Sequence, residues 1–414
     1  MTSKRVAIIG GGLAGCLTAL ALARKGIHSE VFERNNRELF EASYFNEGKV
    51  HIGYLYAHDF SRETSKLMVS GAVTFRTIIA ELTGFDTAEA LSTPFLYAVH
   101  RDSLVSASDF ENHLLQCSDE FLSHMKDDFT SAGYVDGSRK VEHQRLDFSS
   151  WNNDLDPEFF SAVFQTDELG VDPRTLASAV SRAIRENDKV TLHLGARIHK
   201  VTSSSFERWS LVDSEQFRLG SGDFDLVVNS SWSDLLRIDN NVGIPLPADW
   251  SYRYKLGNRV LRPVSRDDVN SVTVVLGAFG DIVNYGQVGG AFVSWYPSGR
   301  LLMTDEIDLP DWNSENFRAQ REASFELSKT SWESMSAKFR ALNVDSSQVD
   351  TRGGMILATG RLDVDDPASE LHSRIQVGLN QQGSYISINT GKYTLAPLMA
   401  VRAADLAASV LSAQ

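Results

Sequence analysis

Near the N-terminus, the pattern of apolar and polar positions changes from that of a strand to that of a helix and back to that of a strand. Residues 6–9 form a continuous apolar run, as is typical of a buried parallel strand. Three glycines follow, and residues 13–25 then form an apolar stretch of helical length that ends at Gly26. Residues 29–32 are again strand-like and lead into Glu33. The pattern predicts a strand, turn, helix and strand in sequence.

The turn has the spacing Gly10-x-Gly12-x-x-Gly15. The first glycine permits a tight turn, the second lets the backbone approach a pyrophosphate, and the third lets the helix pack against the strand. The N-terminus of the helix then faces the phosphates. Glu33 ends the second strand, where an acidic side chain binds ribose hydroxyls. These features predict a dinucleotide site.

The same N-terminal segment has two other interpretations, a signal peptide and a membrane span. A span needs about 20 uninterrupted apolar residues, and the consecutive glycines break the run. A signal peptide ends in a small-residue cleavage site, whereas Arg24-Lys25-Gly26 is followed by another strand-like run. The dinucleotide interpretation is therefore preferred.

Hydrophobic patterning predicts a second region of different architecture. Strand-like runs occur at residues 252–261, 271–276, 290–296 and 301–303, with a turn at Pro297-Ser298-Gly299 between the last two. Strands joined by short turns indicate an antiparallel sheet. Residues 315–342 are expected to form a helix.

Composition narrows the classes of function. The chain has 414 residues, 42% of them hydrophobic and 23% charged, and a net charge of −14, which argues against nucleic acid and anionic membranes as partners. Its two cysteines form neither a disulfide framework nor a Cys-x-x-Cys motif, and no zinc or nucleophile-elbow motif occurs. We expect a cytoplasmic protein with a small-molecule substrate; its oligomeric state is open.

The choice of dinucleotide depends on two segments. Glu33 disfavours the 2′-phosphate of NADP, which leaves NAD and FAD. Residues 42–59 then carry Asn46, Gly48, Lys49, His51 and Gly53, spaced as if the backbone passes close to a flat polar ligand. A polar surface loop is the other interpretation of that segment.

These motifs together resemble the D-amino-acid-oxidase-like (DAO) FAD-dependent oxidoreductases. The stretch from Asn46 to Tyr56 is most similar to the branch with L-2-hydroxyglutarate and glycerol-3-phosphate dehydrogenases. Three more pieces are similar to the family: residues 170–201, with Ile198 at the adenine; residues 225–233; and residues 388–411, a strand, glycine turn and helix. At Ser230-Ser231 the family's usual glycine is missing, and Trp232 follows directly.

The resemblance implies FAD as the cofactor and a Rossmann-type α/β domain with a second α+β substrate domain on an antiparallel sheet. We expect the FAD-binding domain over residues 1–92, 155–238 and 346–414, and the substrate domain over 93–154 and 239–345. The cofactor contacts that it implies, together with those of the glycine motif, are Gly10, Gly12, Leu13, Ala14, Gly15, Glu33, Arg34, Asn46, Gly48, Lys49, Val50, His51, Ile198, Ser230, Ser231, Gly391, Lys392, Tyr393 and Thr394.

Catalytic groups are predicted from the chemistry of C–H oxidation beside a hydroxyl or amine. His51 is the candidate base, because histidine titrates near neutral pH; the alternative is that it only shapes the flavin site. An acidic substrate needs a cation such as arginine, and Arg361 is preferred over Arg253, Arg259, Arg300 and Arg352. The expected activity is that of an FAD-dependent oxidase or dehydrogenase. An NAD-linked dehydrogenase and a non-catalytic nucleotide-binding protein are the alternatives.

Overall fold

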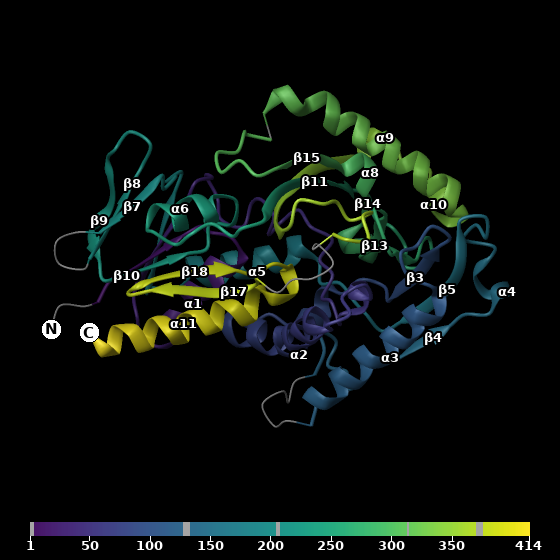
Figure 1. Ribbon diagram of the computed structural model, residues 1–414, viewed down its shortest axis with the longest axis horizontal. Coiled ribbons are helices and arrows are strands. Elements are labelled where there is room, and N and C mark those ends of the chain that lie inside the picture. Colours follow the sequence, from purple (N-terminus) through teal and green to yellow (C-terminus); the bar gives the residue numbers. More distant parts are fainter. Residues whose placement is uncertain (1–3, 127–132, 204–207, 313, 370–375) are drawn as a thin grey trace.

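The computed structural model describes residues 4–126, 133–203, 208–312, 314–369 and 376–414. The described chain forms two large sheets with helices packed around them (Figure 1). The first is a six-stranded sheet and the second a nine-stranded, largely antiparallel sheet. This arrangement confirms the expected α/β fold class with a second, antiparallel part.

The six-stranded sheet has the order β17–β18–β10–β1–β2–β6 and is parallel except for β17. The side chains of β1 alternate between two cores: Val6 and Ile8 face the helical layer, while Ala7 and Ile9 face the opposite side. The strands are β1 (Val6–Ile9), β2 (Ser29–Glu33), β6 (Val190–Leu194), β10 (Leu226–Asn229), β17 (Gly378–Gln382) and β18 (Tyr385–Asn389).

Four helices form the layer on one side of this sheet: α1 (Leu13–Arg24), α2 (Glu63–Thr83), α5 (Pro173–Arg185) and α11 (Ala396–Ala413). Helix α5 begins at an Asp172 cap followed by Pro173, and α11 carries Pro397 in its first turn, both of which suit a helix start. By length and composition α11 could cross a membrane, but more than half of its apolar window is buried in the protein.

The opposite side of the six-stranded sheet is covered by smaller elements. A three-stranded antiparallel sheet and helix α6 (Leu235–Asn241) pack there, around Ile198, Leu211 and Phe224. Its strands are β7 (Lys200–Ser203), β8 (Trp209–Val212) and β9 (Arg218–Phe224).

The larger sheet has the order β15–β11–β14–β13–β12–β3–β5–β4, and β16 pairs with β11 along its whole length. Only the β12–β3 pair among these described strands is parallel. The strands are β3 (Phe95–His100), β4 (His143–Arg145), β5 (Phe160–Thr166), β11 (Trp250–Val260), β12 (Ser271–Val275), β13 (Gly280–Asn284), β14 (Ala291–Trp295), β15 (Arg300–Thr304) and β16 (Val349–Thr359).

Sheet membership differs from the predicted domain boundaries at two strands. Residues 155–238 and 346–414 were both expected in the FAD-binding domain, yet β5 and β16 belong to the larger sheet. Strand β5 pairs with β3, and β16 pairs with β11, so long-range hydrogen bonds hold each strand there. The remaining boundaries stay a prediction.

Helices of the second part pack on the larger sheet. Helix α3 (Ala107–His124) lies beside α2, while α9 (Arg318–Met335) and α10 (Ala337–Leu342) arch over the far face (Figure 1). The single helix expected over residues 315–342 is broken at Ser336, which is extended and accepts a hydrogen bond from the Phe339 amide as the cap of α10. Short helices complete the set: α4 (Phe148–Trp151), α7 (Gly286–Gly289) and α8 (Tyr296–Gly299).

Candidate active site

A cleft of about 1400 Å³, including the open solvent at its mouth, lies at the carboxyl ends of the parallel strands. The residues that follow β1, β2, β10 and β18 form one wall, and Met355 and Ile356 of β16 form part of the other. Ligands of doubly wound sheets bind at this position, outside the carboxyl ends of the strands.

The glycine turn after β1 shapes the deepest wall. Gly10 has a φ of +98°, and a Cβ there would lie 2.6 Å from the Ser230 carbonyl oxygen. A Cβ at Gly15 would overlap the Gly10 carbonyl oxygen. A Cβ at Gly12, by contrast, would meet only the Ser43 hydroxyl, at 3.1 Å. The turn therefore leaves room beside Gly12, at the N-terminus of α1, where a pyrophosphate fits.

Glu33 lies at the end of β2 and its carboxylate also orders the turn. The Gly11 amide donates to Oε2 at 2.8 Å and the Asn35 amide donates to Oε1 at 2.8 Å. Burial raises the pKa of Glu33, although these hydrogen bonds oppose the rise. The carboxylate lines the cleft, where it can accept from ribose hydroxyls.

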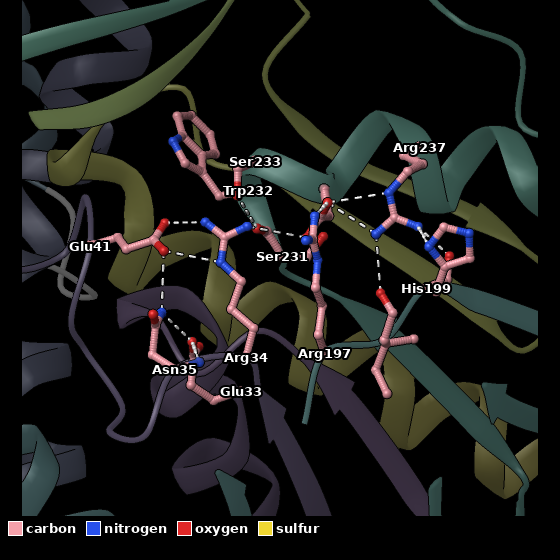
Figure 2. A network of polar contacts seen from close by, with 12 residues as sticks. Glu33, Arg34, Asn35, Glu41, Arg197, His199, Ser231, Trp232, Ser233 and Arg237 are labelled. Atoms are coloured by element: carbon pink, nitrogen blue, oxygen red, sulfur yellow. Dashed lines mark hydrogen bonds and ion pairs between the residues drawn. The ribbon is translucent and has the colours of Figure 1, made fainter. Parts of the chain in front are cut away.

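Next to Glu33, three arginines surround one carboxylate (Figure 2). Asp234 lies 3.0 Å from Arg237, 3.3 Å from Arg34 and 3.4 Å from Arg197. Burial would raise the pKa of Asp234, but the three guanidinium groups lower it overall. Arg34 also binds Glu41 through two nitrogens. This network fixes the cleft wall at its Glu33 end.

Part of the segment expected to pass close to the flavin, residues 46–51, runs along the opposite end of the cleft. Asn46, Lys49 and His51 line it, and the His51 amide donates to the Thr394 hydroxyl at 2.9 Å. The Lys49 ammonium, however, points into the larger sheet, where it binds Asp281 at 2.7 Å and the Thr273 hydroxyl. Lys49 is 1% exposed. Contrary to expectation, its ammonium is therefore not available to a flavin.

All but four of the predicted cofactor contacts line the cleft. The exceptions lie behind its wall: Gly15 packs on the turn, Gly48 packs on the Tyr285 hydroxyl, Val50 is fully buried, and Thr394 joins the loop to the C-terminal turn. The predicted residues that do line it are Gly10, Gly12, Leu13, Ala14, Glu33, Arg34, Asn46, Lys49, His51, Ile198, Ser230, Ser231, Gly391, Lys392 and Tyr393.

The missing glycine after Ser231 has a visible consequence. Trp232 itself adopts the left-handed conformation, with a φ of +56°, which is rare for a large side chain. Its indole nitrogen donates to the Met355 carbonyl oxygen at 2.6 Å and so ties the cleft wall to β16. The Ser230 hydroxyl is used in a hydrogen bond to the Ile9 carbonyl oxygen, at 2.9 Å.

The arginine predicted for substrate binding is not in the cleft. The Arg361 side chain is 58% exposed and pairs with Asp249 and Asp305. Arg361 lies just beyond the end of β16 and outside the cleft lining, so that prediction was wrong. The other four candidates also pair with carboxylates away from the lining: Arg253 and Arg300 with Asp363, Arg259 with Asp172, and Arg352 with Asp350.

Lysines supply the positive charge at the His51 end instead. Glu47 lines the cleft there, and although burial would raise its pKa, Lys255, Lys392 and Lys49 lower it to about 2. Three carboxylates, Glu47, Asp281 and Glu168, lie near these lysines. Lys392 lines the cleft itself, so its ammonium favours an anionic ligand at this end.

Several lining residues were not predicted as site residues. Phe40, Glu41 and Ser43 follow the first βαβ unit in an irregular segment that has no periodic signal. Met355 and Ile356 belong to a strand-like run, but the face that each residue presents depends on pairing with β11. Ala396, the first residue of α11, also lines the cleft, so the N-terminus of that helix opens on it.

Comparison with protein families agrees with this architecture. A family model described as FAD dependent oxidoreductase (DAO) matches residues 5–252. A relative from Pseudomonas fluorescens (strain Pf0-1), the tRNA 5-methylaminomethyl-2-thiouridine biosynthesis bifunctional protein MnmC, is 33% identical over 120 residues. That match spans 28% of this chain but only 18% of the relative's length.

Solved structures with this fold cover almost the whole chain. Glycine oxidase from Geobacillus kaustophilus has a TM-score of 0.63 at 15% identity, over 98% of this chain and 95% of its own. The L-alpha-glycerophosphate oxidase from Mycoplasma pneumoniae, solved with FAD bound, has a TM-score of 0.63 at 13% identity, over 100% and 95%. Iminodiacetate oxidase from Chelativorans sp. BNC1 has a TM-score of 0.61 at 16% identity, over 99% of this chain and 96% of its own.

Proposed function

The chain belongs to the DAO family of FAD-dependent oxidoreductases, and from this premise we propose that it oxidises a C–H bond beside an amine or hydroxyl in a small acidic substrate. The electrons pass to oxygen or another acceptor. The observation that carries the proposal is the pairing of a buried cleft histidine, His51, with a lysine-rich cleft end. Three similar structures, glycine, glycerophosphate and iminodiacetate oxidases, are named for small acidic compounds.

In this proposal FAD supplies the hydride acceptor, and the protein supplies binding and proton transfer. The turn at Gly12, with Glu33, holds the pyrophosphate and ribose end of the cofactor. Lys392 in the cleft wall attracts the acidic group of the substrate. His51 takes the hydroxyl or ammonium proton of the substrate, because an imidazole is basic at neutral pH.

A bleaching screen tests the substrate class. Purified protein should absorb near 450 nm, and anaerobic addition of an acidic substrate should remove that absorbance. The probes are glycine, glycerol 3-phosphate, iminodiacetate and 2-hydroxy acids, each against a neutral analogue such as ethanolamine or glycerol. We expect at least one acidic compound to bleach the flavin and its neutral analogue to fail. Bleaching by neutral compounds alone would contradict the proposed class.

The role of His51 is tested by His51→Ala with the substrate found in that screen. The variant should keep its flavin and reduce it at least about a hundredfold more slowly, as expected for loss of a general base. Stopped-flow absorbance measures the rate of flavin reduction, and the absorbance near 450 nm before mixing measures the flavin content.

Two other results would change the assignment. A variant that reduces its flavin at nearly the wild-type rate would remove His51 from the catalytic residues and favour an amine that binds already deprotonated. A variant that loses its flavin would place His51 in the cofactor shell instead. Acid precipitation of wild-type protein then distinguishes a covalent tether, which leaves a yellow pellet, from non-covalent binding.

A further inference from the structure

Behind His51 lies a carboxyl group that the proposed reaction has not used. Glu168 is fully buried, in the segment between β5 and α5. We infer that Glu168 is a positioning residue: it orients the His51 imidazole and balances the positive charge that His51 gains on taking a substrate proton. This inference rests on the proposed function, since it needs His51 to act as the base.

The position of Glu168 is set by the loop that carries His51. Its Oε2 accepts from the Ile52 amide at 2.7 Å, and its Oε1 is bonded by the Tyr97 hydroxyl. The same Oε1 lies 3.7 Å from Nδ1 of His51, within ion-pair distance but longer than a hydrogen bond. Such contacts are often loose without ligands and shorten in the complex. Because Nδ1 faces the carboxylate, Nε2 is assigned to the cleft.

Charge balance in the buried surroundings supports the pairing. Lys49 is already bound to Asp281, so Glu168 has no lysine of its own in hydrogen-bond contact among the described residues. Burial raises the pKa of Glu168 above its ordinary value, and Lys49 opposes this rise only in part. The ionisable and polar groups that surround the pair are Lys49, Tyr54, Tyr56, Cys117, Tyr97, Tyr134 and Asp281.

The proton balance of the step is simple. One proton leaves the substrate hydroxyl or ammonium and binds Nε2 of His51, while Nδ1 keeps its own proton and directs it to Glu168. The imidazolium then faces a carboxylate within 4 Å, which favours the charged ring. A neutral amide in place of the Glu168 carboxylate would no longer stabilise the charged ring, while the base, His51, would remain.

The test is a nitrogen-15 NMR titration of FAD-loaded protein labelled at histidine. The His51 signals are assigned by their loss in His51→Gln. In wild-type protein the neutral ring should carry its proton on Nδ1. In Glu168→Gln the midpoint of the His51 titration should move to lower pH by about 1–3 units, because an opposite charge at this distance changes a titration by that amount.

Two variants accompany this comparison. Glu168→Asp keeps the charge at a greater distance, so its midpoint should fall between those of wild type and Glu168→Gln. Glu38→Gln is the matched control, since Glu38 is another buried glutamate, but it is bound to Arg185 and Ser181 and lies outside the cleft lining. Its His51 titration should equal that of wild type.

The outcomes separate the two proposals. An unchanged His51 titration in Glu168→Gln overturns the positioning role, even where His51→Ala abolishes flavin reduction. If Glu168→Gln does not fold, the titration of His51 in Glu168→Asp is the test. A His51 midpoint in Glu168→Asp equal to that of wild type overturns the inference. Normal flavin reduction by His51→Ala defeats the base assignment itself. If both the base role of His51 and the positioning role of Glu168 are correct, the double variant His51→Ala/Glu168→Gln should reduce its flavin no more slowly than His51→Ala.

Discussion

In the phosphate turn, the packing of the protein requires glycine at positions 10 and 15 but not at position 12. Gly10 has a positive φ and Gly15 touches the Gly10 carbonyl group, so both are needed by the backbone. Gly12 has a φ of −77°, which any residue adopts, and only the Ser43 hydroxyl is near its missing side chain. We therefore attribute the glycine at position 12 to the ligand, which needs the space that a side chain would fill.

This difference predicts contrasting effects of two alanine substitutions. Gly12→Ala should leave the unfolding temperature of the apoprotein close to wild type and weaken FAD binding at least about tenfold, or about 1.4 kcal/mol. Gly15→Ala should lower the unfolding temperature as well, because its methyl group overlaps backbone. Calorimetry of the apoproteins and fluorescence titration with FAD measure the two effects. Normal FAD affinity in Gly12→Ala would show that the pyrophosphate lies elsewhere.

Local spacing explains which single residues could be predicted. Gly10, Gly12, Gly15 and Glu33 follow from one motif, because adjacent elements hold them together whatever the rest of the chain does. Glu168 could not be found in this way, since the hydrogen bond that it accepts from the Ile52 amide joins residues 116 positions apart in sequence. Arg361 was wrongly predicted because it was chosen for its position after a strand-like run, residues 355–359, and that position does not determine which way its side chain points.

At the scale of elements, the loop of residues 46–51 is bound to strands of the larger sheet by a buried ion pair. The Lys49 ammonium binds Thr273 of β12 and Asp281 of β13, and it lies 4.3 Å from the centre of the Phe95 ring. Together with the antiparallel bridge between Lys49 and Gly170, this ion pair holds the loop beside the cleft.

Breaking this pair should destabilise the protein. Asp281→Asn leaves the Lys49 charge buried without its partner, which costs about 3–5 kcal/mol of unfolding free energy. Burial would raise the pKa of Asp281, but Lys49 lowers it overall, so its stabilisation is present above the ordinary aspartate pKa of about 3.9 and is lost as pH falls below it. Denaturant unfolding should therefore show a gap between wild type and variant that narrows below about pH 4.

A surface pair provides the control for that measurement. Glu63 and Lys66 are exposed on α2, and Glu63→Gln should change the unfolding free energy little at any of these pH values. An Asp281→Asn variant as stable as this control at neutral pH would contradict the role of the buried pair.

Elements themselves could be predicted where periodicity is strong and local. Strands β1, β2, β11, β12 and β14 and helix α1 occur close to their predicted ranges. The break at Ser336 depends on its hydrogen bond to Asp154, at 2.8 Å, which no local pattern contains. The sheet to which β5 and β16 belong likewise depends on partners far along the chain.

At the scale of the whole molecule, the two sheets share one cleft. Residues from the six-stranded sheet and from β16 line it together, and the Trp232 indole joins the two walls. A ligand in the cleft touches both parts and should stabilise them as a unit.

Removal of FAD should therefore lower the stability of both parts. Free FAD at 100 times its dissociation constant adds about 2.7 kcal/mol to the unfolding free energy of the apoprotein. Calorimetry of FAD-loaded protein should show one transition, whose temperature rises with FAD concentration. Two transitions, only one of which responds to FAD, would mean that the sheets unfold independently and that the cleft does not couple them.

The six-stranded sheet also has a consequence for biosynthesis, because its strands come from the start, middle and end of the chain. Strand β1 is made first, but its neighbour β10 arrives more than 200 residues later and β18 only at Tyr385–Asn389. Gly391 and Lys392, which line the cleft, follow even later. During translation the nascent chain thus has no complete flavin pocket until its final helix emerges from the ribosome. Ribosome-stalled or proteolysed fragments that lack residues 385–413 should therefore remain colourless in cells.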